Sequence, residues 1–557
     1  MANFLLPLLT TVSSRVKNNF SQKTRRTSAV QEQFLLSLLS AYQNTELGNA
    51  YKIGEIKTID QFRSRIPVLP YSSYESYIER IANSEQNILT NDPVVYLNLT
   101  SGSTSKQKLI PVTKRFQNSL RQANLTSIGF LHEALKSQGR KFGKLLATNS
   151  VQLVGTTSGG IDYGTASVGV LRMGKFVYEQ LFSHPYETLQ PVDSLARHYL
   201  CLLFALGNPN LRGIGANFPM LVLRICNYLE IYTEDLIKDL ETGTIALWLS
   251  LEPKVRALLE QQMLANPRRA KQLREIYKSN GILTPKLAWP DLSFVATARG
   301  GTSDFYFERF TTYFGDTPGF GAVYSSAEGT FSINHDLNTD GSILAIESGF
   351  FEFIPQDQWE TEHPQTLLAT EVKLGEFYRI LVTNYSGFYR YDIGDVVEVV
   401  GFYEQAPLLV FRYRRGGLLS STTEKTTEFH VTQVMQELQQ KFSVLLEDFC
   451  ITLSDETIPP AYLVNIELAP GETLEDYSGF LTAFDLLLQE NNTSYAIKRP
   501  DTIPSPRLRV LARGSFAIVR QRQLLKGIPD SQLKFPHISS DRNFLSGLQV
   551  IQEIRID

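Results

Sequence analysis

A run of small hydroxyl residues followed by two lysines is the first place in this sequence where chemistry is expected. Residues 99–111 read Leu-Thr-Ser-Gly-Ser-Thr-Ser-Lys-Gln-Lys-Leu-Ile-Pro and include the end of a short β-rich run at residues 94–99. Small polar residues let several backbone N–H groups converge on an anion, while the hydroxyls donate hydrogen bonds and the lysines supply charge. The run does not match the GxxxxGK[ST] phosphate loop, because it holds one glycine and no Ser or Thr follows either lysine. We interpret it as a phosphate-binding turn, with a plain Ser/Thr-rich linker as the alternative.

Two acidic residues in later turns have the chemistry to complete a nucleotide site. Glu328 lies in the segment Val-Tyr-Ser-Ser-Ala-Glu-Gly, residues 323–329, just after a strand-like run. Its carboxylate could hold Mg²⁺ on a nucleotide phosphate, and the ring of Tyr324 could stack on a base. Asp395 follows a glycine within residues 387–396, and one carboxylate can accept both hydrogen bonds from the vicinal hydroxyls of a ribose. Taken singly, each acid is equally typical of a solvated turn.

Several other classes of function are excluded by motif and composition. The sequence contains no GxGxxG, GxSxG or kinase motif, which removes the common dinucleotide, serine-hydrolase and kinase interpretations. Its three cysteines and seven histidines are scattered, so we expect no zinc site and no disulfide framework, and predict a reducing, cytoplasmic compartment. The net charge of −3 favours neither nucleic acid nor an anionic membrane as a partner. No apolar run has the length that a membrane span requires.

Hydrophobic periodicity and turn residues predict an α/β protein. At 557 residues the chain is too long for one ordinary core, so two or more domains are expected. Long helical patterns alternate with short β-rich runs, which is typical of layered sheets and helices. Helices are expected at about 31–42, 72–82 and 114–136 and, with interruptions, across 193–277; strands are expected at 94–99, 292–297, 321–324, 343–347, 350–354, 377–383 and 395–400.

A change of composition near residue 415 predicts a domain boundary. Residues 412–428 become polar, basic and glycine-containing, and the pair Gly416–Gly417 suits a hinge. The patterns that follow predict a smaller α+β unit with helices near 432–441 and 473–489 and strands near 462–468 and 507–512. We therefore place the domains at residues 1–414 and 415–557.

The N-terminal segment is basic. Residues 1–31 contain five Lys or Arg and no Asp or Glu, a composition that resembles an organellar transit peptide. We favour the ordinary alternative, a basic first helix from residue 4 to about residue 20 followed by a polar loop.

The three chemical segments occur in an order that resembles the adenylate-forming acyl ligases. More closely, the chain resembles the auxin-responsive promoter family of acyl acid amido synthetases, which includes the indoleacetic acid and jasmonate amido synthetases, and its bacterial relatives. Any one motif is weak, whereas their ordered combination from about residue 30 to 545 is specific. Besides the three segments, the resemblance is carried by residues 63–71, 78–82, 350–355, 372–402, 406–407, 418–420, 424–426 and 533–536.

The resemblance implies both a fold and a set of site residues. The fold is a large N-terminal domain of β-sheets flanked by helices, followed by a small, mobile α+β C-terminal domain. In the family the first segment wraps the phosphates of ATP, the second binds the adenylate and Mg²⁺, and the third holds the ribose. Carried onto this sequence, the phosphate residues are Ser101, Gly102, Ser103, Thr104 and Lys108; the adenylate and metal residues are Tyr324, Ser326 and Glu328; the ribose residue is Asp395; the residue near the hinge is Arg414; and the C-terminal lysines are Lys425 and Lys534.

The implied activity is the ATP-dependent joining of a carboxylic acid to an amine. The resemblance predicts that an aryl, indole or acyl acid is adenylated and then transferred to an amino acid by a monomer or weak dimer. An acyl-CoA ligase and a non-catalytic nucleotide-binding relative are the alternatives. Two departures from the family pattern motivate the second: Ser105 replaces the glycine usual in the bacterial relatives, and Asp392 replaces a usually basic residue. The added negative charge of Asp392 would weaken triphosphate binding unless Arg390 pairs with it.

Overall fold

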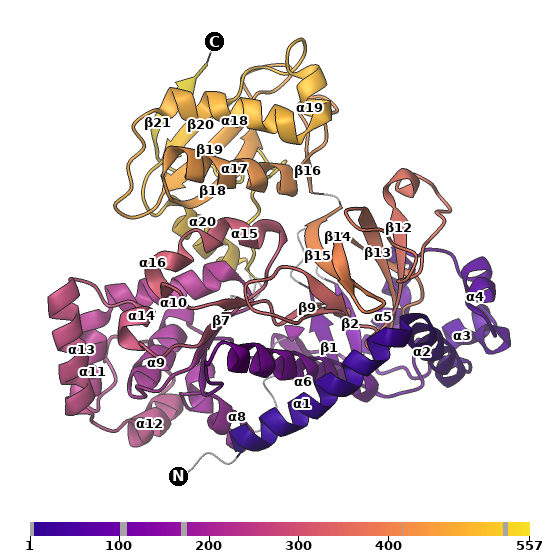
Figure 1. The fold of residues 1–557 in the computed structure, drawn as a ribbon, viewed down its shortest axis with the longest axis horizontal. Helices are drawn as coiled ribbons and strands as arrows, with labels where there is room; N and C mark the ends of the chain where they lie inside the picture. The colour runs from indigo at the N-terminus through magenta and orange to yellow at the C-terminus, as the bar shows by residue number, and fades with distance from the viewer. Residues whose placement is uncertain are drawn as a thin grey trace. The chain divides into compact units, whose positions relative to one another are not determined.

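The chain forms two compact units, seen in the computed structural model of Figure 1, which describes residues 5–100, 108–166, 168, 175–415, 417–526 and 533–556. The N-terminal unit comprises Met1–Arg299, Phe310–Ile393 and Val397–Val410, and the C-terminal unit comprises Gly300–Arg309, Gly394–Val396 and Phe411–Asp557. The predicted domain boundary between residues 414 and 415 describes parts of the chain that move as separate bodies, and it stays a prediction. The predicted α/β class is confirmed.

Three sheets build the N-terminal unit. A seven-stranded sheet has the order β12-β13-β14-β15-β11-β10-β9, a four-stranded sheet has the order β2-β1-β5-β4, and another has the order β3-β6-β7-β8. In the third sheet each neighbouring pair is parallel. The bounds are β1 Val94–Leu99, β2 Leu109–Thr113, β3 Leu145–Ala147, β4 Gly155–Thr156, β5 Asp162–Gly164, β6 Gly213–Gly215, β7 Phe294–Ala296, β8 Gly319–Phe320, β9 Val323–Ser326, β10 Gly329–Asn334, β11 Ser342–Leu344, β12 Phe350–Pro355, β13 Phe377–Thr383, β14 Tyr391–Tyr403 and β15 Ala406–Arg414.

The N-terminal unit is also rich in helices, many of which begin at recognisable sequence signals. α6 begins after Thr113, whose hydroxyl accepts a hydrogen bond from Phe116 N at 3.2 Å, as an N-cap should. Proline occupies the first turn of α10, α12, α13 and α14, where its missing N–H costs nothing. The bounds are α1 Leu5–Lys23, α2 Thr27–Tyr42, α3 Glu46–Ala50, α4 Ile59–Arg65, α5 Glu75–Ala82, α6 Lys114–Ser137, α8 Lys175–Leu181, α9 Ser194–Leu206, α10 Pro219–Ile231, α11 Thr233–Thr242, α12 Pro253–Gln262, α13 Pro267–Asn280, α14 Pro285–Ala288 and α16 Phe310–Phe314.

The basic N-terminal segment is a helix packed into this unit. α1 lies along α6 (Figure 1), and a Cβ on Gly129 of α6 would come within 2.4 Å of the carbonyl oxygen of Ser13. Phe20 is buried, and Lys23 Nζ lies 2.5 Å from the carboxylate of Glu347. The absence of a side chain at Gly129 therefore allows the two helices to approach closely. The expected first helix is present, but the polar loop expected after it is instead the 3₁₀ turn Thr24–Arg26, which leads directly into α2.

The main core of the N-terminal unit joins the early helices to the seven-stranded sheet. Phe62 of α4 packs edge-on against Phe350 of β12, with ring centres 5.9 Å apart, and both rings are buried. Tyr74 donates a hydrogen bond to Tyr389 O at 2.8 Å. These contacts fix the early helices against residues more than 280 positions later in the chain.

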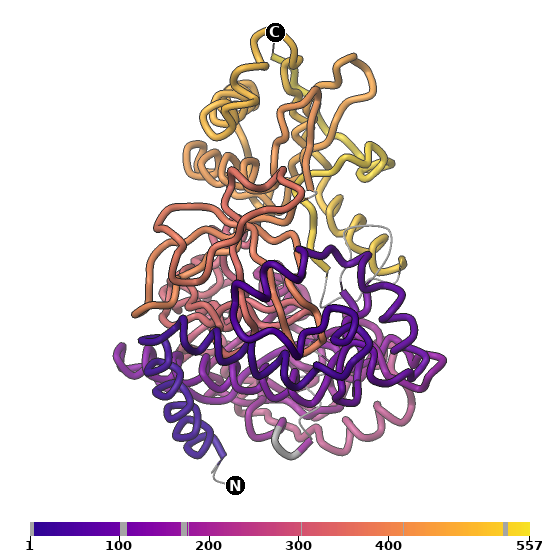
Figure 2. Tube along the Cα trace, turned by 90° about the vertical axis from the view of Figure 1, so that its right-hand side faces the viewer, coloured from indigo at the N-terminus to yellow at the C-terminus, as the bar shows by residue number. Residues whose placement is uncertain are grey.

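The C-terminal unit contains a four-stranded mixed sheet with helices, and its residues from Phe411 on are drawn from orange to yellow in Figures 1 and 2. Its order is β18-β19-β20-β21, in which β19 and β20 are parallel and the other neighbours antiparallel. The bounds are α15 Asp304–Phe307, β16 Leu418–Leu419, β17 Thr426–Thr427, α17 Glu428–Phe442, β18 Leu446–Leu453, β19 Tyr462–Leu468, α18 Tyr477–Asn491, α19 Thr493–Lys498, β20 Arg507–Leu511, α20 Ser515–Leu525 and β21 Val550–Arg555. In the described part of the chain, 3₁₀ turns lie at Thr24–Arg26, Ile53–Glu55, Tyr71–Ser73, Tyr186–Leu189, Gly301–Ser303 and Gln356–Gln358.

Within the described part of the chain, no helix combines the length and apolar character needed to cross a membrane.

Candidate active site

Glu328 is held in a tight hairpin inside the N-terminal unit. β9 and β10 are joined by the two residues Ala327 and Glu328, since Ser326 pairs with Gly329. Ser326 Oγ donates to Glu328 Oε2 at 2.6 Å, and Tyr391 Oη donates to Glu328 Oε1 at 3.3 Å. The whole residue is 2% exposed. Both carboxylate oxygens are therefore fixed, and the partner from β14 links the second predicted segment to the third.

The carboxylate of Glu328 fits one mode of Mg²⁺ binding. Among the described residues no group of three or more His, Cys, Asp or Glu side chains could hold a metal. Mg²⁺ on a nucleotide is commonly bound by one or two carboxylates together with phosphate oxygens and water. Each oxygen of Glu328 receives one of the hydrogen bonds above and has a second lone pair, so this side chain suits a single-carboxylate site.

The base of the predicted phosphate turn is well defined. Thr100 and Lys108 are joined by two hydrogen bonds, from Thr100 N to Lys108 O at 3.0 Å and from Lys108 N to Thr100 Oγ1 at 3.2 Å. Lys108 Nζ lies 5.0 Å from the ring centre of Tyr71. The predicted phosphate residues Ser101, Gly102, Ser103 and Thr104, like Ser105, lie outside the described residues.

Tyr71 connects this turn to its surroundings. Its hydroxyl donates to Leu109 O and accepts from Leu109 N, each at 3.0 Å. Burial raises the pKa of Tyr71 to about 12, and the negative charge of Glu328 contributes to the rise. The tyrosine therefore stays neutral and keeps its donor, while its ring face supports the cation of Lys108.

Tyr324 packs its ring against the core of the N-terminal unit. The ring stacks on Phe331 of β10, with centres 5.1 Å apart and planes at 27°. One ring face is thus engaged within the hairpin, and base stacking by Tyr324 stays a proposal.

Asp395 belongs to the C-terminal unit, where it is paired with Arg414. Arg414 Nε lies 2.6 Å from Asp395 Oδ1, and the aspartate side chain is 2% exposed. Gly394 has φ +81°, and its carbonyl accepts a hydrogen bond from Arg415 N at 2.6 Å. Glycine is required here because a left-handed conformation costs other residues energy. The pairing brings together two residues that the sequence assigned separately.

Asp392 is compensated, but by a different arginine from the one considered in the sequence. Arg379 Nε lies 3.1 Å from Asp392 Oδ2. Arg390 instead donates to both oxygens of the buried Glu352, at 3.0 and 3.1 Å. The sequence left open whether Arg390 would pair with Asp392; the side chain of Arg390 instead binds the more buried carboxylate of Glu352.

The two C-terminal lysines are exposed. Lys534 Nζ lies 3.8 Å from Glu428 Oε2 and 5.4 Å from the ring centre of Phe411, and its side chain is 38% exposed. Lys425 has φ +56°, and its backbone N donates to Ser420 Oγ at 2.9 Å. Both side chains are accessible to solvent, and their binding of phosphate stays a prediction.

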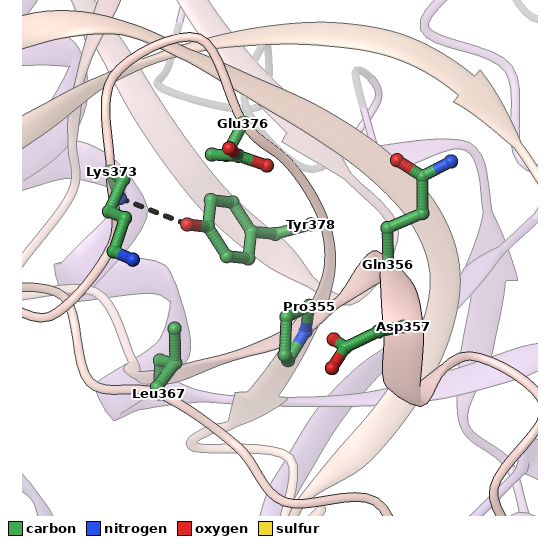
Figure 3. Close-up of a pocket in the computed structure, with 7 residues that line it drawn as sticks. All are labelled: Pro355, Gln356, Asp357, Leu367, Lys373, Glu376 and Tyr378. Atoms are coloured by element: carbon green, nitrogen blue, oxygen red, sulfur yellow. Dashed lines mark hydrogen bonds between the residues drawn. The ribbon is translucent and has the colours of Figure 1, made fainter.

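A depression of about 540 Å³ lies elsewhere in the N-terminal unit (Figure 3). The hydroxyl of Tyr378, near its centre, accepts a hydrogen bond from Lys373 N at 2.9 Å. None of the predicted nucleotide residues lines it, so we assign it no part in the site. Its lining is Pro355, Gln356, Asp357, Leu367, Lys373, Glu376 and Tyr378.

Two contacts of the site were not predicted from sequence. Tyr391 was quoted within the third segment without a role, and Tyr71 lies in a stretch noted only for its resemblance. The spacing of residues in the sequence could not predict either contact, because the partners are far apart in the chain. Tyr391 lies 63 residues from Glu328, and Tyr71 lies 38 residues from Leu109.

Models of one protein family match three consecutive parts of this chain. The model of the GH3 family N-terminal domain matches residues 16–319, that of the central domain residues 342–414, and that of the C-terminal domain residues 429–543. Jasmonoyl–L-amino acid synthetase GH3.5 of Oryza sativa subsp. japonica is 26% identical over 94% of each chain. Indole-3-acetic acid-amido synthetase GH3.17 of Arabidopsis thaliana is 26% identical over 80% of this chain and 79% of its own.

Solved structures show the same fold. The AtGH3.15 acyl acid amido synthetase in complex with 2,4-DB has a TM-score of 0.88 at 23% identity over 98% of both chains. A 2-hydroxyisobutyryl-CoA ligase has a TM-score of 0.54 at 11% identity over 93% of this chain and 89% of its own. The residues matched by the N-terminal model alone are more than half of the 557 in the chain. The predicted resemblance is thus confirmed, and the chain belongs to the GH3 family.

Proposed function

We propose that this protein is an ATP- and Mg²⁺-dependent acyl acid amido synthetase that adenylates a carboxylic acid and transfers the acyl group to an amino acid. The observation that carries the proposal is the buried Glu328 hairpin beside β1, the strand that leads into the hydroxyl-rich turn. The named relatives are amido synthetases for jasmonate and indole-3-acetic acid, which supports an amide as the product. The acid is of aryl, indole or acyl type.

The first half-reaction converts the carboxylate, which is a poor acylating agent, into a reactive acyl-adenylate. A carboxylate has oxide as its leaving group, whereas an acyl-adenylate has AMP. One carboxylate oxygen attacks the α-phosphorus of ATP, and the bond from that phosphorus to the pyrophosphate oxygen breaks. When bound, Mg²⁺ neutralises charge that develops on the phosphates.

The residues of this chain are proposed to orient the phosphates and stabilise their charge. Glu328 holds the metal from a fixed position, and Lys108 supplies positive charge beside the turn. Ser101, Gly102, Ser103 and Thr104 surround the phosphates with donors. Asp395, oriented by Arg414, accepts hydrogen bonds from the ribose.

The second half-reaction is attack of an amine on the acyl carbonyl carbon. The bond from that carbon to the AMP oxygen breaks, and the nitrogen loses a proton. Water must be excluded, because it would hydrolyse the adenylate. We propose that Lys425 and Lys534 act on the phosphates from a C-terminal domain, residues 415–557, that changes position between the half-reactions.

A two-stage assay tests the proposal. Acid-dependent exchange of pyrophosphate into ATP, over a panel of aryl, indole and fatty acids, is expected for at least one acid. Mass spectrometry should then find an amide when amino acids are added. A thioester formed with coenzyme A and no amide would favour an acyl-CoA ligase. Nucleotide binding without exchange would favour a non-catalytic relative.

The cellular setting follows the same proposal. All three cysteines are free and buried, as in proteins of reducing compartments, which supports a cytoplasmic location. We propose that the enzyme works as a monomer or weak dimer.

A further inference from the structure

The loop that carries Glu328 has two backbone carbonyls that the hairpin itself does not satisfy. Ala327 and Glu328 are the two loop residues between β9 and β10, so their carbonyls take no part in the ladder. Glu328 is buried, and a buried carbonyl without a partner is costly. The buried carbonyl of Glu328 therefore needs a partner from outside the hairpin.

Two buried asparagines, remote from each other in sequence, provide the partners. Asn98 Nδ2 donates to Ala327 O at 2.8 Å, and Asn384 Nδ2 donates to Glu328 O at 2.8 Å. The two asparagines are 4% and 1% exposed. Consecutive carbonyls of one loop are thus each held by a separate side-chain amide.

Asn384 is itself held in place by the turn that follows β13. Its Oδ1 accepts a hydrogen bond from Ser386 N at 3.0 Å, and its backbone N donates to Phe388 O at 3.1 Å. Ser386 Oγ donates to Pro111 O of β2 at 2.7 Å. The amide of Asn384 therefore cannot rotate freely, and its turn is tied to the strand that follows the phosphate turn.

Asn98 connects the same loop to the strand on the other side of the phosphate turn. It lies in β1, two residues before Thr100, and it is paired with Ile110 of β2. Asparagine is uncommon in strands, so its presence here calls for a specific reason. The hydrogen bond to Ala327 O supplies that reason, because it fixes the Glu328 loop relative to β1 and β2, the two strands on either side of the phosphate turn.

We propose that Asn98 and Asn384 are positioning residues that fix the direction of the Glu328 carboxylate toward Mg²⁺ bound with ATP. This inference rests on the proposed function. Side-chain hydrogen bonds hold the two carboxylate oxygens, and these amides hold the backbone from which the carboxylate projects. Removal of either amide leaves the metal ligand in place but loosens its orientation. Groups that orient a metal ligand typically affect metal affinity or activity about 10- to 100-fold.

The test measures metal dependence by binding rather than by turnover. Binding of α,β-methylene-ATP is followed by calorimetry at increasing Mg²⁺ for the wild type, Asn98→Leu and Asn384→Leu. Both variants should need about 10-fold more Mg²⁺ for half-maximal binding. Asn98→Ser and Asn384→Ser, whose side chains are too short to reach the carbonyls, should shift the curve in the same direction if a leucine variant does not fold.

Gln31→Met is the matched control. Gln31 is a buried amide of the same unit that donates to Ile346 O at 2.7 Å and Gly349 O at 2.8 Å, neither of which belongs to a predicted nucleotide residue. Its loss should lower the unfolding midpoint without changing the Mg²⁺ requirement. Variants of Asn98 and Asn384 that bind with the wild-type Mg²⁺ dependence would overturn the positioning role. A wild type that binds the analogue without any Mg²⁺ dependence would instead count against the metal role of Glu328 itself.

Discussion

The Glu328 hairpin and the cationic side chains of the C-terminal unit represent two ways of holding a charge. Glu328 is 2% exposed, and both of its carboxylate oxygens accept hydrogen bonds. In contrast, the side chains of Arg414 and Lys534 are 45% and 38% exposed. The hairpin is fixed by its surroundings, whereas these two cationic side chains are partly exposed to solvent.

The difference matches what each charge is proposed to do. A fixed charge stabilises a transition state without reorganising during the reaction. An exposed ion pair contributes about 0–1 kcal/mol, so a lysine such as Lys534 can leave its partner at little cost. We infer that the N-terminal unit provides permanent charge, while the C-terminal unit provides charge that changes partners.

Glu328→Gln should give the largest effect. The amide keeps the shape of the side chain but loses the negative charge that the proposed metal requires. Several kcal/mol of stabilisation are lost with such a charge, which corresponds to about 1000-fold in acid-dependent pyrophosphate exchange. Glu404→Gln, which removes the partner of Arg25 at 3.2 Å in the same unit, should retain activity. If the Glu328→Gln enzyme exchanged pyrophosphate as fast as this control, the comparison between the fixed charge of Glu328 and the exposed charges of the C-terminal unit would lose its basis.

Lys534→Ala should have a smaller effect, on adenylation. A charged hydrogen bond to a phosphate is worth about 1.5–3 kcal/mol, so pyrophosphate exchange should fall about 10- to 100-fold. Lys441→Ala, an exposed lysine at the end of α17, serves as the control. Equal exchange rates in the two variants would show that Lys534 does not reach the phosphates.

Asp395→Asn should mainly weaken nucleotide binding. The variant loses a charged acceptor for the ribose and the partner of Arg414, so the KM for ATP should rise about 10-fold while kcat changes less. Asp485→Asn is the matched control, because Asp485 is also a buried carboxylate of the C-terminal unit and is paired with Arg499 at 2.9 Å. If both variants raise the KM equally, the effect is one of folding and not of ribose recognition.

The pH dependence of stability should show the smallest effect, and it reports on the C-terminal unit. Burial lowers the pKa of His430 from 6.5 to about 4. Between these values the unfolded chain binds a proton that the folded chain does not, so the free energy of unfolding falls as the pH falls, by at most about 1.4 kcal/mol per pH unit. Above pH 6.5 both forms are neutral and the contribution is constant.

His430→Gln separates this titration from the helix cap. His430 Nδ1 accepts a hydrogen bond from Thr427 N at 3.2 Å, and a glutamine at this capping-box position can also accept it. Urea unfolding from pH 7 to 4.5 should show a shallower dependence in the variant, provided that the C-terminal transition is resolved. His184 of the N-terminal unit, whose pKa burial also lowers to about 4, should keep its own dependence in both proteins. An unchanged slope for the C-terminal transition would contradict the prediction.

Some elements with regular patterns were predicted at nearly their observed bounds, and one strand that contains a buried acid was missed. The helix expected at 114–136 is α6, Lys114–Ser137, and the strand expected at 377–383 is β13, Phe377–Thr383. β18, Leu446–Leu453, was missed because Asp448 interrupts its apolar pattern. That aspartate is fully buried, 3.3 Å from His537 Nε2. A sequence pattern cannot reveal a partner that lies 89 residues away.

The interruption of the helical region expected near residues 213–219 is present, because α9 ends at Leu206 and α10 begins at Pro219, but the strand inside it was not predicted. Its glycines suggested a break in a helical region, but Gly213–Gly215 form β6, which lies between β3 and β7 in a parallel sheet. A Cβ at Gly213 would come within 2.5 Å of the side chains of Leu145 and Phe294. Residue 213 is a glycine because neighbouring side chains in the sheet leave no room for a Cβ, and not because the chain turns there.

The sequence by itself determined the family, the α/β class and the order of three polar segments, because side-chain chemistry and local spacing are properties of the chain. Only the tertiary structure decided which groups hold those segments: Tyr391 and Ser326 on the carboxylate of Glu328, Asn98 and Asn384 on its loop, and Arg379 instead of Arg390 on Asp392. A hydrogen bond depends on distance and direction in space, and folding brings these partners together from strands that are far apart in sequence.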